Sequence, residues 1–245
     1  MPKAGFTRPV EARTGEREHV HMNARRLFVA IAAVAAIATG WSVAADAAEI
    51  ETSIARGGRL YDTWYKEIKS TRPEDAHPSY TGKKAKQSWR CVTCHGWDYT
   101  GDKETGVKGI KGAAGKDPAA IVAILRDKTH QYGPDKLNDK DAGDLAMFVS
   151  KGQVDMAKYV DLAASKPKGN GAKGEVYYNS LCGVCHGLDG KKVSTGMALG
   201  QASEYPTAVL HKALNGQPAE AMPMLRAFDN SIAADIIAYI TQLPK

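Results

Sequence analysis

The sequence has few aromatic residues, only four cysteines and no dense run of one charge. Aromatic side chains make up 7% of its 245 residues, and 33 Lys or Arg against 27 Asp or Glu give a formal net charge of +6. Nucleic-acid binding needs a dense basic face, so this weak excess gives that function no support. Apolar residues make up 43% and charged residues 24%, which fits neither a disordered chain nor a membrane protein with many spans. The length suggests one large domain or two small ones.

Long apolar runs are absent except for one near the N-terminus. Residues 27–45 contain no charged side chain, a pair of arginines precedes them, and the segment Ala45-Asp46-Ala47 follows. A basic segment, an apolar segment and a small-x-small cleavage site are the three parts of a secretory signal peptide. We therefore predict that residues 1–47 are a leader and signal peptide, with Met22 as an alternative start, and that the protein is periplasmic. An uncleaved N-terminal membrane anchor is the competing interpretation.

The four cysteines form two copies of one pattern. Cys91-Val-Thr-Cys94-His95 and Cys182-Gly-Val-Cys185-His186 lie 91 residues apart. Cys-x-x-Cys-His is the attachment pattern of c-type haem. Both thiols lie on one helical turn and reach the two vinyl groups of a porphyrin, and the next histidine supplies the proximal imidazole ligand to iron. The pattern predicts two covalently bound haem c groups attached through Cys91, Cys94, Cys182 and Cys185, with His95 and His186 as proximal iron ligands.

Other uses of paired cysteines fit the sequence less well. A redox-active Cys-x-x-Cys pair needs a βαβ context, which is missing here. A zinc site would need the two distant pairs to converge on one ion, although each pair already carries a histidine. Export also agrees with haem attachment, which takes place outside the cytoplasm.

The chain contains an internal repeat. Asp144-Leu-Ala-Met-Phe-Val149 corresponds to Asp235-Ile-Ile-Ala-Tyr-Ile240, and Gly58-Arg-Leu-Tyr61 corresponds to Gly174-Glu-Val-Tyr177. The first copy carries about 25 more residues between this glycine segment and its cysteines. We predict one domain over residues 48–164 with an inserted loop at 69–88, a Gly-, Pro- and Lys-rich linker at 165–174, and a second domain at 175–245.

Short apolar periodicities predict helices, and alternating strand patterns are missing. The predicted helices cover residues 119–126 and 207–214, each just behind a proline, and residues 141–149 and 231–243 near the end of each repeat. Loops rich in Gly and Lys follow both cysteine motifs. The predicted fold class is all-α.

The chain resembles the class I cytochrome c family in a tandem, dihaem form. The resemblance covers nearly all of residues 50–245 and is strongest in the second repeat, where the cysteine motif, Met222-Pro223 and an apolar last helix follow in order. It implies two tandem domains, each a few short helices wrapped around a covalent haem c. It also implies that Met222 is the distal ligand of the second iron, with Met224 and Met197 as the alternatives.

No Met-Pro pair precedes the last helix of the first repeat. His130 lies 14 residues before Asp144. Met222 lies 13 residues before Asp235, so His130 stands in the corresponding place and is the predicted distal ligand of the first iron. The alternatives are that His130 is an exposed loop residue, or that the ligand is His77, Met147 or Met156. A first haem without any of these ligands would have an open axial position.

These features favour periplasmic electron transfer by a dihaem c-type cytochrome, with one His/His haem and one His/Met haem and no enzymatic activity. A His/Met site has the higher potential, so electrons are expected to pass from the first haem to the second. Expected partners are redox proteins, a donor dehydrogenase and an acceptor cytochrome or oxidase, with no nucleic acid and with a membrane only if the N-terminal segment is uncleaved. One alternative is a dihaem subunit of a periplasmic oxidoreductase complex. Another is a dihaem enzyme of the peroxidase or thiosulfate dehydrogenase type, if the first haem has an open axial position.

Overall fold

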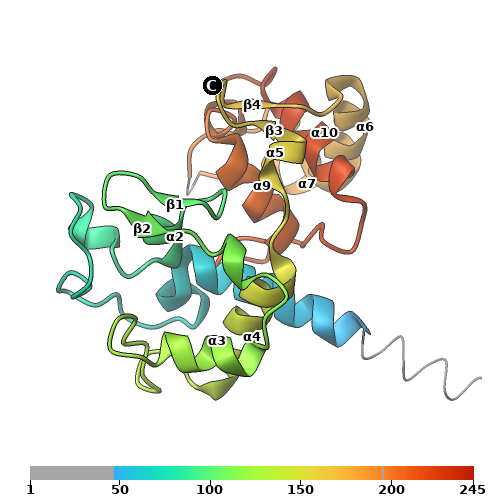
Figure 1. Cartoon of the computed structure of the whole chain (residues 1–245). Coiled ribbons are helices and arrows are strands. Elements are labelled where there is room, and N and C mark those ends of the chain that lie inside the picture. The colour runs from blue at the N-terminus through green and yellow to red at the C-terminus, as the bar shows by residue number, and fades with distance from the viewer. Residues whose placement is uncertain (1–46, 195) are drawn as a thin grey trace, which may run out of the picture. The chain divides into compact units, whose positions relative to one another are not determined.

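Most of the described chain forms short helices connected by long loops (Figure 1). The computed structural model describes residues 47–194 and 196–245, so the predicted leader, the apolar run at 27–45 and Met22 lie outside the described residues. No helix in the described part of the chain is both long enough and apolar enough to cross a membrane.

The first repeat begins with a long helix over residues 47–67, the N-terminal helix. The elements that follow are η1 (Ala85–Gln87), α2 (Cys91–His95), β1 (Gly101–Asp102), β2 (Val107–Lys108), η2 (Lys111–Ala113), α3 (Pro118–Leu125), α4 (Asp139–Met147) and the π-helical segment η3 (Phe148–Gly152). Strands β1 and β2 pair antiparallel, with Gly101 opposite Lys108, and close the Gly-rich loop behind the first cysteine motif.

The second repeat follows a short connection that has structure of its own. In the connection, α5 (Met156–Tyr159) leads into β3 (Val160–Asp161), which pairs antiparallel with β4 (Lys166–Pro167). The second repeat comprises α6 (Gly171–Leu181), α7 (Gly183–His186), α8 (Leu199–Ala202), α9 (Pro206–Asn215) and α10 (Asn230–Ile240). Residues 166–167 are therefore paired and residues 171–174 are helical, although the composition of 165–174 predicts a linker. The prediction of a helical fold is confirmed, and the two strand pairs each only close a loop.

Local signals explain where the predicted helices begin. Pro118 and Pro206 occupy the first turns of α3 and α9, where a missing backbone N–H costs nothing. Asn138 caps α4 in a capping box with Asp141, and the side chain of Asp229 caps α10. Four helices were predicted at these places, and all four form with ends shifted by one to three residues.

The same helix crossing occurs in both repeats. Helix α10 packs against α6 (Figure 1), and a Cβ atom added at Gly174 would overlap with the carbonyl oxygen of Asp235. In the first repeat, a Cβ atom at Gly57 would overlap in the same way with the carbonyl oxygen of Asp144. Glycine is needed at both positions because two helix backbones come into contact there.

This crossing corrects the alignment of the repeat by one residue. The hydroxyl of Tyr61 donates to the carbonyl of Gly96, and that of Tyr178 donates to the carbonyl of Gly187, both at 2.6 Å. The corresponding segments are therefore 57–61 and 174–178, rather than 58–61 and 174–177. The sequence offers two adjacent glycines, Gly57 and Gly58, and only the packing distinguishes them.

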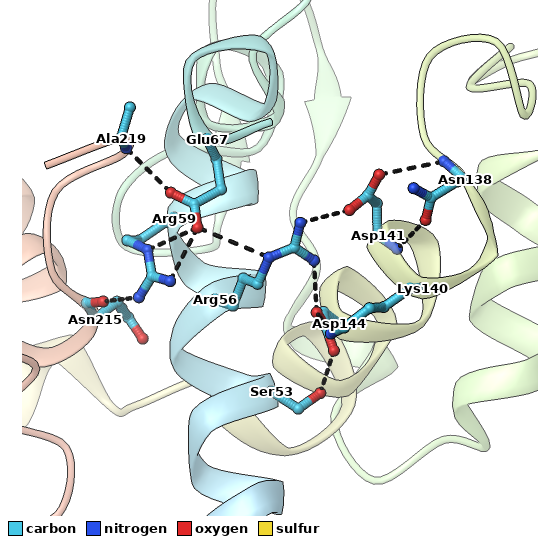
Figure 2. Close-up of polar contacts among 10 residues, drawn as sticks. All are labelled: Ser53, Arg56, Arg59, Glu67, Asn138, Lys140, Asp141, Asp144, Asn215 and Ala219. Carbon is cyan, nitrogen blue, oxygen red and sulfur yellow. Dashed lines mark hydrogen bonds and ion pairs between the residues drawn. The ribbon is translucent and has the colours of Figure 1, made fainter. Parts of the chain in front are cut away.

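The two repeats are in contact, and residues 47–245 form one compact unit. His211 in α9 donates from Nε2 to the carbonyl of Gly58 in the N-terminal helix, at 2.8 Å. Figure 2 shows a polar network beside this contact, in which Glu67 accepts from Arg59 and from the backbone N–H of Ala219. Its other branch runs from Arg56 to Asp141 and Asp144 of α4. The network therefore joins the N-terminal helix both to α4 and to the loop behind α9.

Candidate haem-binding sites

The first cysteine motif forms one turn of helix. Helix α2 begins at Cys91 and ends at His95, because Gly96 takes a left-handed backbone conformation with φ of 75°. Val92 points into the core, whereas Cys91, Cys94 and His95 are partly exposed. The helical turn brings the thiols at positions i and i+3 to one side of the helix, as attachment to one porphyrin edge requires.

The thiols of Cys91, Cys94 and Cys182 do not have the character of redox-active cysteines. Burial raises the pKa of Cys91 to about 12, and a negative charge at Cys94 would raise it further. Burial followed by the charge of Asp102 raises the pKa of Cys94, and burial raises that of Cys182 to about 11. A redox-active Cys-x-x-Cys pair lowers the pKa of its nucleophile, so the raised values agree with structural attachment and not with disulfide exchange.

His95 is oriented by the β1–β2 loop. Its Nδ1 lies 2.7 Å from the carbonyl oxygen of Lys108 in β2, and a carbonyl oxygen only accepts, so Nδ1 carries the proton. Burial lowers the pKa of His95, and the hydrogen bond to Lys108 only partly offsets this, so the ring is neutral. Metal-bound histidines commonly have one nitrogen bonded to a carbonyl, which leaves the other nitrogen for the metal. Nε2 of His95 is therefore the nitrogen that could bind a haem iron.

His130 lies near His95, at the separation that two imidazole ligands of one metal ion would have. The ring centres are 6.2 Å apart and the ring planes differ by 19°. A metal–imidazole bond is about 2.0 Å long and the ring centre lies about 1.2 Å behind the bonding nitrogen, so two imidazoles on opposite sides of one metal have centres roughly 6.4 Å apart. Nδ1 of His130 lies 3.1 Å from the carboxylate of Asp127, which directs Nε2 away from that partner. These residues fit a haem iron between His95 and His130.

The alternative ligands of the first site have other roles. His77 is only 7% exposed and both of its ring nitrogens are hydrogen-bonded, Nε2 to the carbonyl of His130 and Nδ1 to the backbone N–H of Ser79. Met156 is fully buried in the core, and Met147 packs against the same core. The side chain of His130 is half-buried.

The second cysteine motif repeats this local structure. Cys182 lies at the N-terminal end of α7, His186 is its last residue, and Gly187 ends the helix with φ of 76°. Burial lowers the pKa of His186, and the negative charge of Glu220 opposes that effect. Glu220 lies on the loop over residues 216–229.

Met222 lies on that same loop, between α9 and α10. Its side chain is half-buried, as is that of Met224, whereas Met197 is 50% exposed. The loop is attached to α9 through the backbone N–H groups of Leu225 and Arg226, which donate to the carbonyls of Ala213 and Leu214 at 3.0 and 3.2 Å.

His211 is a buried residue that the sequence analysis missed. It is fully buried, its Nε2 donates to Gly58, and its Nδ1 accepts from the hydroxyl of Tyr99 at 3.0 Å. Burial lowers its pKa to about 4, so it is neutral. Its ring lies 5.1 Å from that of Trp97, two residues beyond His95. The apolar residues Leu210, Ala213 and Leu214 around it in the predicted helix were the one available signal that it faces inward.

The helical fold and the cysteine motifs are those expected of a c-type cytochrome. Residues 169–240 match the family described as cytochrome C oxidase, cbb3-type, subunit III, and this segment includes the second cysteine motif and Met222. This match supports a c-type cytochrome with covalently bound haem c and a role in electron transfer, in a family whose cytochrome c domains are typically extracytoplasmic. No curated protein matches the chain. Among the described residues, no group of three or more His, Cys, Asp or Glu side chains is arranged to hold a metal ion.

Proposed function

We propose that the chain is a periplasmic dihaem cytochrome that transfers electrons and catalyses no reaction of its own. Both repeats are class I cytochrome c domains in this proposal. The observation that carries it is the pair of nearly parallel rings of His95 and His130, 6.2 Å apart, in the repeat that the family match does not cover. The basic, apolar and small-residue segments at the N-terminus support export to the periplasm.

In the first site, Cys91 and Cys94 hold the haem and two histidines are its axial ligands. A haem supplies one-electron chemistry at its iron. His95 is the proximal ligand, oriented by Lys108, and His130 is the distal ligand, oriented by Asp127. A carboxylate partner raises the basicity of a ligating imidazole and thereby favours ferric iron. This site is therefore the one of lower potential.

In the second site, Cys182 and Cys185 hold the haem, with His186 and Met222 as axial ligands. A thioether ligand favours ferrous iron and raises the potential. Electrons would therefore enter at the site of lower potential and leave from the site of higher potential for a redox protein of higher potential still. If all four proposed ligands bound iron, neither site would have a place for a substrate, which argues against the peroxidase and thiosulfate dehydrogenase types.

The experiment removes one haem at a time from the matured protein. Cys91→Ala/Cys94→Ala is expected to retain one haem of high potential, and Cys182→Ala/Cys185→Ala one haem of low potential. Potentiometric titration of the wild type should show two one-electron steps that match those of the two variants. A single haem in the wild type, or two equal potentials, would contradict the proposal.

A second candidate is a cytochrome subunit of a periplasmic oxidoreductase complex. The matched family is described as a subunit of an oxidase, which is the observation that favours it. Size-exclusion chromatography with light scattering on protein from the producing cells distinguishes the two. A carrier elutes at the mass of its own chain, whereas a subunit elutes with a second polypeptide in constant ratio.

A further inference from the structure

The inserted segment of the first repeat contacts the loop that carries His130. We propose that residues 75–88, here called the strap, hold His130 on the first iron, and that His77 is the positioning residue of the strap. This inference rests on the proposed ligand role of His130. The second repeat has no equivalent segment, because Tyr178 lies only four residues before Cys182.

Residues 126–138, between α3 and α4, form the loop that carries His130 and are here called the ligand loop. Two side chains of the strap bind consecutive carbonyl groups of this loop. His77 donates from Nε2 to the carbonyl of His130 at 2.8 Å. Ser79 donates from its hydroxyl to the carbonyl of Thr129 at 2.7 Å. The backbone of the ligand loop is therefore held at His130 itself and at the residue before it.

The hydrogen bonds of His77 fix which of its nitrogens is the donor. The backbone N–H of Ser79 points at Nδ1 at 3.2 Å, so Nδ1 is an acceptor and the proton is on Nε2. The backbone N–H of His77 donates to the hydroxyl of Ser88 at 2.8 Å, and the ring packs edge-on against Trp89 with centres 4.4 Å apart. The ring of His77 is thus held in one orientation before it contacts His130.

The strap is also attached beside the first cysteine motif. The indole N–H of Trp89 donates to the carbonyl of Asp75 at 2.8 Å, at the beginning of the strap. The carbonyl of Trp89 accepts from the hydroxyl of Tyr132 at 2.8 Å, two residues beyond His130. Trp89 therefore joins the strap and the ligand loop two residues before Cys91.

The backbone of the ligand loop is in an unfavourable conformation next to His130. Gln131, next to His130, has a φ of 55°, a left-handed conformation that is unfavourable for a residue with a side chain. A loop held only by its own turn would relax from this conformation and move His130. The strap should therefore slow the dissociation of His130 from the iron. Because a bis-His iron binds an external ligand only after one histidine dissociates, the strap should also slow the binding of such a ligand.

Carbon monoxide binding to the reduced dihaem protein measures this dissociation. His130→Ala identifies the kinetic phase of the first haem. His77→Leu removes the Nε2 donor and is expected to accelerate that phase at least tenfold, whereas His77→Gln retains a donor and should stay within about twofold of the wild type. Ser79→Ala, which leaves the core intact, should accelerate it about threefold, and the exposed control Lys86→Ala should have no effect.

The outcomes distinguish the role of the strap from the assignment of His130 as an iron ligand. If His130→Ala leaves the ferric spectrum and the carbon monoxide rate unchanged, the proposed function fails for the first haem. If His130→Ala opens the site but His77→Leu and Ser79→Ala both react at the wild-type rate, the strap inference alone is overturned. Should His77→Leu fail to mature with two haems, an unchanged rate in Ser79→Ala overturns the inference and an accelerated rate supports it.

Discussion

Asp127 is the residue that distinguishes the two histidines of the first site. Its carboxylate accepts from the backbone N–H groups of Thr129 and His130, at 2.8 and 2.9 Å, and lies 3.1 Å from Nδ1 of His130. His95 has a neutral carbonyl in the equivalent role. The carboxylate therefore contacts His130 and not His95.

Asp127→Asn tests that charge. Asparagine retains the oxygen that accepts both backbone N–H groups but loses the negative charge, so the imidazole becomes less basic and ferric iron less favoured. We expect the potential of the first haem to rise and that of the second to stay unchanged in a spectroelectrochemical titration. Equal shifts of both potentials would show that Asp127 acts through the general field of the protein and not through His130.

The packing of each repeat depends on its helix crossing. At Gly57 and Gly174 the nearest atoms are the backbone carbonyl oxygens of Asp144 and Asp235, which no side-chain rotation can move. By contrast, nothing lies within 4 Å of the Cβ position of Gly143, on helix α4.

Substitution by alanine should therefore have opposite effects at these positions. Gly174→Ala and Gly57→Ala must separate two packed helices and should lower the free energy of unfolding of the holoprotein by about 3 kcal/mol. Gly143→Ala should raise it by about 0.5–1 kcal/mol, because alanine loses less backbone entropy in a helix. Denaturant unfolding followed by circular dichroism gives all three values, and a neutral Gly174→Ala would refute the equivalence of the two crossings.

At the scale of helices and loops, the sequence predicted the helices but not the contacts that hold the loops in place. Prolines, caps and apolar periodicity are local signals, and they placed α3, α4, α9 and α10 to within three residues. The contacts of the strap join residues 53 positions apart, as between His77 and His130, and no local pattern reports such a pairing. The alignment at Gly57 failed for the same reason, since only packing against Asp144 distinguishes it from its neighbour.

Over the whole molecule, an ion cluster ties the two repeats together. Asp62 of the N-terminal helix is 1% exposed and accepts from Arg90 at 2.6 Å and from Lys212 of α9. Burial alone would raise the pKa of Asp62, but the attraction of Lys212 and Arg90 outweighs burial and lowers the pKa below its ordinary value of 3.8. Arg90 and Lys212 also lie over the ring of Trp97, 5.9 and 5.4 Å from its centre. No sequence motif predicted this cluster, because its members come from different repeats.

The stabilisation by Asp62 should depend on pH in one direction. A carboxyl whose pKa is lowered by folding stabilises the protein above its unfolded pKa, and this stabilisation is lost as pH falls through the folded value. Asp62→Asn deprives the partly buried Arg90 and Lys212 of their shared carboxylate, so we expect the free energy of unfolding to fall by about 3 kcal/mol at pH 7. The difference from wild type should shrink below about pH 4 and vanish once Asp62 is protonated.

Thermal unfolding of both holoproteins between pH 2 and pH 7 measures this dependence. Asp135→Asn is the matched control, since its exposed carboxylate pairs only with Lys136 at the surface and should give no measurable change. A difference between Asp62→Asn and wild type that persists undiminished at pH 2 would mean that packing, and not charge, joins the repeats.

The proposed function requires two six-coordinate haems in this chain, one with two histidine ligands and one with histidine and methionine. The most direct test is the haem content of the matured protein together with its ferric electron paramagnetic resonance and near-infrared spectra. We expect two haems per chain, no high-spin signal, a rhombic low-spin spectrum from the nearly parallel His95 and His130 rings, and a thioether-to-iron charge-transfer band that Met222→Ala abolishes. One haem per chain, or a high-spin signal in the wild type, would contradict the account.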